Sequence, residues 1–244
     1  NYLPLMPAAI DALDFSDYDF ILSTSVAVAK GAKPYKNAVH ICYCNTPMRY
    51  IWDQYEEYFG RGRAGLATRT AMALAAPYLR RWDIRTCERV KYFIANSNNV
   101  AERISRIYER TSEVIYPPVS TDLFTVSHND MGYYLIVSAL VPYKRVDLAV
   151  EAFNRSGEKL LIVGSGPEME KLKKMAKRNI EFLGWQGQES LAALYSGCRA
   201  LIFPGVEDFG IVPLEAMASG KPVVAFAKGG ALETVVGEGS SPTG

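Results

Sequence analysis

Short apolar runs of strand length recur along the whole chain, and segments with helical periodicity separate most of them. This alternation predicts parallel sheets covered by helices on both faces, which is an α/β fold of doubly wound domains. The runs fall into two groups. The expected strands of the first group are residues 20–22, 39–43, 92–95 and 114–116, and those of the second are 133–137, 160–163, 180–183, 200–203 and 223–226.

The segment 117–131 lies between the two groups and is rich in Pro, Ser, Thr and Asp, as is typical of an interdomain connection. We therefore expect one domain over residues 1–125 and a second over residues 126–244. Ligands of open α/β sheets bind beyond the carboxyl ends of the strands. The candidate motifs of the second domain all follow predicted strand ends, so we expect a ligand site there.

The segment from Glu207 to Glu215 reads Glu-Asp-Phe-Gly-Ile-Val-Pro-Leu-Glu and carries the most specific chemistry of the chain. It follows a predicted strand, and Pro213 suits the first turn of a helix that ends near residues 220–222. Amides at the start of such a helix can bind a diphosphate. They belong to Phe209, Gly210, Ile211 and Val212. Glu207 on the loop and Glu215 in the first helical turn are expected to accept hydrogen bonds from sugar hydroxyls, which together predicts a nucleotide-sugar site.

This pattern resembles the two-glutamate signature of the retaining glycosyltransferases of family 4, which have the GT-B fold. Four further segments agree with that family in the same order: residues 137–145, 163–167, 182–185, and Gly229-Gly230 followed by Glu233. Upstream, residues 44–50, 95–97 and 116–119 are most similar to its branch of O-antigen-type mannosyltransferases. The resemblance implies two Rossmann-like domains that face each other across a cleft. It also implies that the chain is an internal piece of a longer protein, truncated at both ends.

The resemblance further implies that a hexose, expected to be mannose, is transferred from a nucleotide sugar to a glycan or lipid-linked acceptor with retention of configuration. GDP-mannose and UDP-hexoses are both candidate donors, because no base-reading residue is recognisable. By analogy with the family, Lys144 stabilises the leaving diphosphate, Glu207 orients the hexose and Glu215 binds the ribose. Such catalysis is electrostatic and positional, so no metal ion and no cofactor are expected. The acceptor is expected to bind the N-terminal domain.

Two positions depart from the family pattern. Ala139 stands where an arginine usually accompanies the lysine, which should weaken phosphate binding unless Arg145 or another group supplies the missing contact. Asn45 stands where the family commonly has a histidine that faces the sugar. An amide in that place can donate a hydrogen bond but does not titrate near neutral pH.

Three further candidates for donor binding each have a structural alternative. Gly164 and Gly166 either let the backbone approach the nucleotide or meet the ordinary steric need of a strand-to-helix turn. Trp185 either stacks on the base or packs against the domain. The Gly229-Gly230 pair either forms a loop close to the donor or is a simple turn.

Composition restricts the other possibilities. The chain has 244 residues, 49% of them hydrophobic, and a formal net charge of +1, so bulk charge gives no reason to expect nucleic-acid binding. It contains neither a long apolar stretch nor a cleavable signal, which makes the cytoplasm the expected compartment. The four cysteines are expected to be buried and reduced, with Cys42 and Cys44 on one strand face. The Asp17-Tyr18-Asp19 motif is expected to be a solvated loop and not a metal site.

Residues 61–91 hold eight Lys and Arg side chains against two acidic ones, with apolar side chains between them. This pattern predicts a basic amphipathic helix, interrupted by Pro77. Such a helix either makes a peripheral contact with the anionic inner face of a membrane or is simply a solvated surface.

Two other functions stay open on the residues alone. With Ala139, Asn45 and the expected truncation, the chain could bind a nucleotide sugar without turnover. A nucleotide-sugar epimerase of the GT-B fold would also bind such a ligand, but it should need acidic and histidine groups for proton abstraction. The chain has only two histidines, which disfavours the epimerase.

Overall fold

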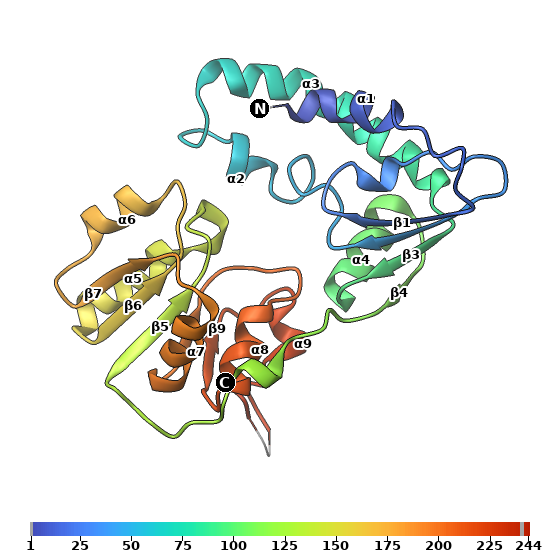
Figure 1. The fold of residues 1–244 in the computed structure, drawn as a ribbon. Coiled ribbons are helices and arrows are strands. Elements are labelled where there is room, and N and C mark those ends of the chain that lie inside the picture. Colours follow the sequence, from blue (N-terminus) through green and yellow to red (C-terminus); the bar gives the residue numbers. More distant parts are fainter. Residues whose placement is uncertain (1, 240–241) are drawn as a thin grey trace. The chain divides into compact units, whose positions relative to one another are not determined.

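The computed structural model describes residues 2–239 and 242–244. The chain divides into two compact units, Asn1–Pro117 and Pro118–Gly244, here called the first unit and the second unit. The division falls at the start of the connection expected over residues 117–131, eight residues before the expected boundary at 125–126. Each unit is built on its own parallel sheet with flanking helices (Figure 1).

The sheet of the first unit has four parallel strands in the order β1-β2-β3-β4. The strands are β1 (Phe20–Ser25), β2 (Val39–Cys44), β3 (Tyr92–Ala95) and β4 (Ser112–Val114), and the helices are α1 (Met6–Asp11), α2 (Tyr55–Phe59), α3 (Leu66–Arg85) and α4 (Asn98–Tyr108). The first three predicted strands are confirmed. The fourth was placed two residues too late. β4 ends at Val114, the Ile115 N–H makes a last bond of 3.0 Å to the carbonyl of Ala95 in β3, and the chain then runs into Pro117, which has no N–H to donate to a sheet.

Two apolar clusters fill the first unit. In one, Cys42 and Cys44 on the buried face of β2 pack with Val100 and Ile104 of α4. In the other, α3 packs on residues of α2 and on the chain that follows β2. All four cysteines of the protein are buried and free, as predicted.

A buried ion pair lies inside the first unit. Lys30 Nζ is 3.2 Å from Asp83 Oδ1, and both side chains are almost completely shielded from solvent. Trp52 and Tyr108 donate hydrogen bonds of 2.8 and 2.9 Å to the second carboxylate oxygen, Oδ2. These donors compensate the carboxylate for lost water, which is the condition under which a buried charge is tolerated.

Helix α3 is continuous for 20 residues, so the predicted interruption at Pro77 is wrong. Pro77 lies on the exposed side and removes only the N–H that would bond to the carbonyl of Ala73. Meanwhile Met72, Leu79 and Trp82 are buried at helical spacing and hold the helix on the unit. No helix in the part of the chain that the structure describes is both long enough and apolar enough to cross a membrane.

The sheet of the second unit has five parallel strands in the order β7-β6-β5-β8-β9. Its strands are β5 (Tyr133–Val137), β6 (Lys159–Val163), β7 (Ile180–Gly184), β8 (Leu201–Phe203) and β9 (Val223–Ala225). Its helices are α5 (Val146–Ser156), α6 (Met169–Met175), α7 (Gln188–Gly197), α8 (Ile211–Ala218) and α9 (Ala231–Thr234). All five predicted strands are confirmed, with bounds that differ by at most one residue.

Both faces of this sheet are covered, as expected for a doubly wound domain. Leu135 and Leu161 belong to the cluster that contains α7 and α8, whereas Ile136, Leu160 and Ile162 pack with α5 and α6 on the opposite face. From β5 the chain first adds β6 and β7 on one side and then returns to add β8 and β9 on the other. The reversal makes the boundary between β5 and β8 the topological switch point, where ligands of such sheets bind.

Candidate functional site at the switch point of the second unit

The loops after β5 and β8 leave the same edge of the sheet, because the two strands are parallel neighbours. Gly205, in the loop after β8, lies against the backbone of Lys144, in the loop after β5. A Cβ atom at Gly205 would be 2.7 Å from Lys144 Cα and 2.8 Å from its carbonyl oxygen. A glycine is therefore required where the two loops meet, a requirement that the sequence analysis missed.

Lys144 and Glu207 form an ion pair across this junction, with side chains only 17% and 16% exposed. Lys144 ends a short 3-10 turn, Pro142–Lys144, and Glu207 lies on the loop between β8 and α8. The structure thus brings together the two predicted catalytic residues of the second unit. An ion pair shielded from solvent is screened less by salt than a surface pair.

The start of α8 lies at the end of the same loop. Gly210 is the N-cap residue, with φ of +94°, and it has no side chain to accept a hydrogen bond from the first-turn amides. Phe209 is buried, Val212 packs against the core, and Ile211 is 41% exposed. The amide-rich, positive end of the helix dipole therefore lies on the loop that carries Glu207.

Glu215 is the fifth residue of α8, so its predicted place in the first helical turn is wrong. The helix begins at Ile211, two residues before Pro213, which moves Glu215 one turn further along. Its carboxylate has a partner that the sequence analysis missed. The buried Tyr195 of α7 donates a 2.7 Å hydrogen bond from its hydroxyl to Glu215 Oε2.

Burial, and secondarily the charge of Glu215, raise the pKa of Tyr195 well above its ordinary value. Tyr195 is therefore a permanent donor at physiological pH. Its bond orients the Glu215 carboxylate through one of its two oxygens, Oε2. No periodicity or spacing in α7 distinguished this tyrosine from an ordinary core residue.

Gly164 and Gly166 pack against the loop after β5. A Cβ atom at Gly164 would collide with the carbonyl oxygen of Ser138, and one at Gly166 with that of Leu140. The N–H of Leu140 also donates to the carbonyl of Ser165 at 2.9 Å. The steric need of loop packing therefore accounts for both glycines, and their contact with a nucleotide stays a prediction.

The Gly229-Gly230 pair supports the loop that carries Glu207. Gly229 forms a single β-bridge with Glu207, and the N–H of Gly230 donates to the Glu207 carbonyl at 2.9 Å. A Cβ atom at Gly230 would lie too close to the backbone of Asp208 and Phe209. This turn therefore fixes the backbone of the glutamate loop by direct contact.

The remaining donor-binding candidates lie at the surface. Trp185 follows β7 and is 79% exposed, so its packing alternative is wrong and stacking on a base stays a prediction. Arg145 has a left-handed backbone, with φ of +51°, and its exposed side chain donates to Asp147 at 3.2 Å. Ala139 is exposed in the same loop. Substitution of Arg145 for the missing arginine therefore stays a prediction.

Asn45 belongs to the first unit, where it directly follows β2 at the carboxyl edge of the sheet. Its backbone N–H donates to the carbonyl of Ser25 at 2.9 Å. The Asp17-Tyr18-Asp19 motif is an exposed loop before β1, as expected. Over residues 2–239 and 242–244, no three His, Cys, Asp or Glu side chains are grouped so that they could hold a metal ion.

The second unit matches a known family along nearly its whole length. The sequence profile described as "Glycosyl transferases group 1" matches residues 124–242. The second unit is a glycosyl transferases group 1 domain. The switch-point loops, Lys144, Glu207 and Glu215 all lie within the matched residues.

Two curated relatives extend the comparison beyond this domain. An uncharacterized glycosyltransferase of Methanocaldococcus jannaschii is 28% identical over 228 residues, which cover 82% of this chain and 56% of the relative. The O-antigen chain mannosyltransferase RfbU of Salmonella typhimurium is 28% identical over 159 residues, which cover 59% of this chain and 44% of the relative. The chain thus spans about half the length of these relatives.

Solved structures show the fold of both units. Sucrose-phosphate synthase of Thermosynechococcus elongatus superposes with a TM-score of 0.74 and 20% identity, covering 97% of this chain and 63% of that structure. Anabaena HepE in complex with UDP-glucose gives a TM-score of 0.58 at 18% identity, covering 88% of this chain and 82% of that structure. The fold is therefore of the GT-B class, with two Rossmann-like units, as the sequence resemblance implied.

Proposed function

We propose that the chain is the core of a retaining glycosyltransferase that binds its nucleotide-sugar donor at the switch point of the second unit. The observation that carries this proposal is the shielded ion pair of Lys144 and Glu207, which lies on the loop that leads into α8. A cation, a helix N-terminus and one carboxylate occur there together, and a second carboxylate, that of Glu215, lies one turn further along α8. Each matches one part of a nucleotide sugar: the first two match its diphosphate, and the carboxylates match its hydroxyls.

The chemistry of these groups suits departure of a nucleoside diphosphate. Lys144 and the amides at the start of α8 stabilise the negative charge that develops on the leaving phosphate. When the diphosphate replaces Glu207 as the ion-pair partner of Lys144, the Glu207 carboxylate can accept hydrogen bonds from the hexose. Glu215, oriented by Tyr195, accepts from the ribose. Because the charge is stabilised by groups of the chain, the proposed reaction needs no metal ion, and configuration is retained as in family 4.

The sugar proposed is mannose, because RfbU, which is similar to 59% of this chain, is an O-antigen chain mannosyltransferase. GDP-mannose is accordingly the first donor to test. A UDP-hexose is the second, because HepE has the same fold and was solved with UDP-glucose. The proposed acceptor is a glycan or a lipid-linked sugar.

Replacing Lys144 by methionine tests the site, because it removes the charge and keeps most of the side-chain volume. We expect donor hydrolysis by the Lys144→Met variant to be slower by about 100-fold, the usual effect of removing one group that stabilises transition-state charge. Release of free sugar from GDP-mannose and UDP-glucose is the measurement. Lys159→Met is the matched control, since Lys159 is exposed at the opposite end of β6. Equal rates in both variants would contradict the proposed role.

We also propose that α3 makes a peripheral contact with an anionic membrane surface. Leu66, Leu74, Tyr78 and Ile84 are between 46% and 78% exposed and share one helix face with the exposed Arg81 and Arg85. Apolar and basic side chains on one face favour an interfacial location on anionic lipids. Co-sedimentation with phosphatidylglycerol vesicles tests this contact, and the Leu74→Ser/Arg81→Gln variant should stay in the supernatant. Sedimentation equal to that of the unmodified chain would contradict it.

A further inference from the structure

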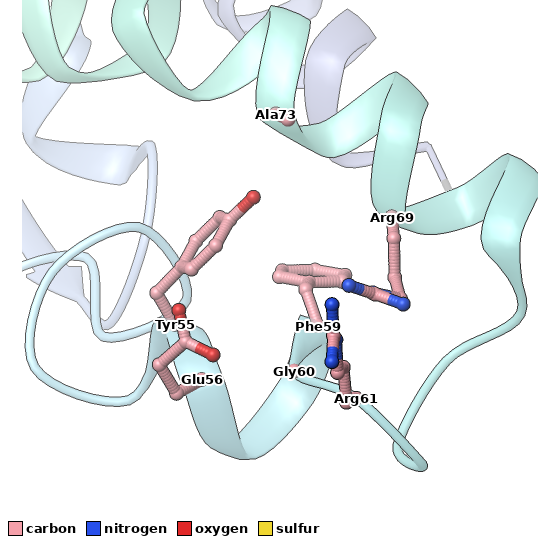
Figure 2. Close-up of a pocket in the computed structure, with 7 residues that line it drawn as sticks. All are labelled: Tyr55, Glu56, Phe59, Gly60, Arg61, Arg69 and Ala73. Atoms are coloured by element: carbon pink, nitrogen blue, oxygen red, sulfur yellow. The ribbon is translucent and has the colours of Figure 1, made fainter.

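The first unit contains a pocket of about 430 Å³ between α2 and the first half of α3 (Figure 2). Side chains of both helices line it, together with Arg61, which follows the end of α2. None of these lining residues belongs to the proposed donor site. The connection between the two units differs in this respect, because it packs directly on a tyrosine of that site.

Backbone hydrogen bonds tie the last part of the connection to two helices of the second unit. The N–H of Ser127 donates at 3.1 Å to the carbonyl of Ser219, the C-cap residue of α8. The N–H of Met131 donates at 2.9 Å to the carbonyl of Gly197, the last residue of α7. The connection is therefore fixed against the carboxyl ends of α7 and α8.

A buried lysine and a glycine add to this attachment. Lys221 is only 5% exposed, and its ammonium group donates to the carbonyl of Asn129. A buried cation needs such an acceptor, so the bond specifies where Asn129 lies. A Cβ atom at Gly220 would be 2.9 Å from Val126 Cγ1, so the absence of a side chain there gives Val126 its place.

Phe124, earlier in the connection, packs on Tyr195 of α7. The two ring centroids are 5.6 Å apart and the rings are inclined at 83°, which is the edge-to-face arrangement that aromatic pairs prefer. Tyr195 is fully buried, and its hydroxyl makes the 2.7 Å bond to Glu215 Oε2. Contacts therefore run without a break from the connection, through the ring and hydroxyl of Tyr195, to the Glu215 carboxylate.

The Phe124 contact helps to determine where the Tyr195 hydroxyl lies. The hydroxyl is at the far end of the ring, so it moves whenever the ring tilts, and a hydrogen bond weakens steeply as its angle departs from the ideal. Truncation of Phe124 would leave a cavity beside the ring, which its neighbours fill only in part. The Glu215 carboxylate would then keep its charge and lose its orientation.

We propose that Phe124 is a positioning residue for donor binding: it holds the ring of Tyr195, and the Tyr195 hydroxyl orients Glu215 towards the ribose. Because Glu215 binds a ribose only if the proposed function is correct, this role rests on that function. Affinity for the nucleotide thus depends on the connection between the units as well as on the loops of the switch point.

Calorimetric titration with GDP and UDP, each compared with its 2′,3′-dideoxy form, tests this role. The dideoxy form has no ribose hydroxyls for Glu215 and reports on the rest of the site. We expect Phe124→Ala to weaken binding of the ribonucleotide about two- to tenfold, the effect of one misplaced hydrogen bond, and to leave binding of the dideoxy form unchanged. Equal weakening of both forms would overturn the assignment, because it would show a general loss of structure.

A double-mutant cycle tests whether Phe124 acts through the Tyr195 hydroxyl. In a Tyr195→Phe background, Phe124→Ala should cause no further loss of affinity for the ribonucleotide, and a loss as large as in the unmodified background would overturn the assignment. Leu123→Ala is the matched control, because Leu123 is the neighbouring residue and is 39% exposed. It should bind the ribonucleotide as the unmodified chain does, and a loss equal to that of Phe124→Ala would count against a specific contact.

Titration of the unmodified chain separates the role of Phe124 from the donor site itself. If the unmodified chain binds neither GDP nor UDP, the donor site is wrong, and the role of Phe124 in it is overturned as well. If it binds one of them and Phe124→Ala binds that nucleotide equally well, the role of Phe124 alone is overturned.

Discussion

Tyr195 is the residue on which the orientation of Glu215 depends, because its hydroxyl donates to one of the two carboxylate oxygens. Tyr195→Phe removes this bond and keeps the ring in its edge-on contact with Phe124. We expect donor affinity to fall about two- to tenfold, which corresponds to the net free energy of one hydrogen bond. Titration of the donor measures the loss.

Tyr133→Phe is the matched control for that change. Tyr133 is also a buried tyrosine, and its hydroxyl donates to the carbonyl of Leu194 at 2.9 Å, away from the carboxylate. We expect this variant to lose stability and to keep its donor affinity. A Tyr195→Phe variant that binds the donor as well as Tyr133→Phe does would contradict the role given to Tyr195.

His40 makes the stability of the first unit depend on pH. It lies between Ser23 Oγ at 2.8 Å and the carbonyl of Arg89 at 3.1 Å, and burial lowers its pKa below the ordinary value of 6.5. A lowered pKa means that the unfolded chain takes up the proton first. The contribution of His40 is therefore complete above about pH 6.5 and is lost as the pH falls through its folded pKa.

Urea unfolding at about pH 7.5 and pH 5.5 measures this effect. Trp52 and Trp82 report on the first unit, and the Trp185→Phe background removes the signal of the second. We expect the free energy of unfolding to decrease as the pH falls, and to decrease more steeply in the unmodified protein than in His40→Gln. The difference between the two slopes should be up to about 1.4 kcal/mol per pH unit. The same pH dependence in both would rule out His40 as its source.

Some site residues were predictable and others were not, for a physical reason. Lys144, Glu207 and Glu215 carry charges in a specific motif, so they could be proposed as site residues from the sequence. Tyr195 looks like a core aromatic, and its role depends on the packing of α7 against α8, which no local pattern encodes. Gly205 was missed for the same reason, because the need for glycine arises from a distant loop.

At the scale of elements, the loops after β5 and β6 support each other through glycines. Gly164 has φ of +126°, and a Cβ atom there would collide with the backbone of Ser138. We expect Gly164→Ala to lower the free energy of unfolding of the second unit by about 2–4 kcal/mol, from backbone strain and overpacking together. It should also weaken donor binding, because the displaced loop leads to Lys144.

Gly157→Ala separates the two causes. Gly157 also has a positive φ, of +77°, but a Cβ atom there would meet no other atom within 4 Å. Gly157→Ala should therefore lower the free energy of unfolding by only about 1–2 kcal/mol, the cost of a left-handed backbone, and should leave donor binding unchanged. Thermal unfolding of both variants gives the comparison, and equal destabilisation would contradict the collision at Gly164.

The strands were predicted more accurately than the helices, because buried parallel strands are short continuous apolar runs. The exceptions have local causes. β4 ends before the apolar residues Ile115 and Tyr116, which are about half exposed beside Pro117. α8 begins two residues before its proline, which displaced Glu215 by one turn. α3 continues through Pro77, because contacts of its buried face compensate for one lost hydrogen bond.

At the scale of the whole molecule, the sequence indicated two α/β domains and the GT-B class, and the structure and its relatives confirm both. The pocket between α2 and α3 was not foreseen, although the basic composition of residues 61–91 was noted. Composition shows how many charges a segment has. Only the folded chain shows that Arg61 and Arg69 line one pocket whereas Arg63 and Arg80 have partners.

The central claim is a metal-independent donor site that includes Glu215, and calorimetric titration of the chain with GDP-mannose and with UDP-glucose in EDTA tests it most directly. We predict micromolar binding of one donor, weakened at least tenfold in Glu215→Gln and unchanged in Glu170→Gln, whose carboxylate is 81% exposed on α6. Binding of neither donor in EDTA, or equal binding by both variants, would contradict the claim.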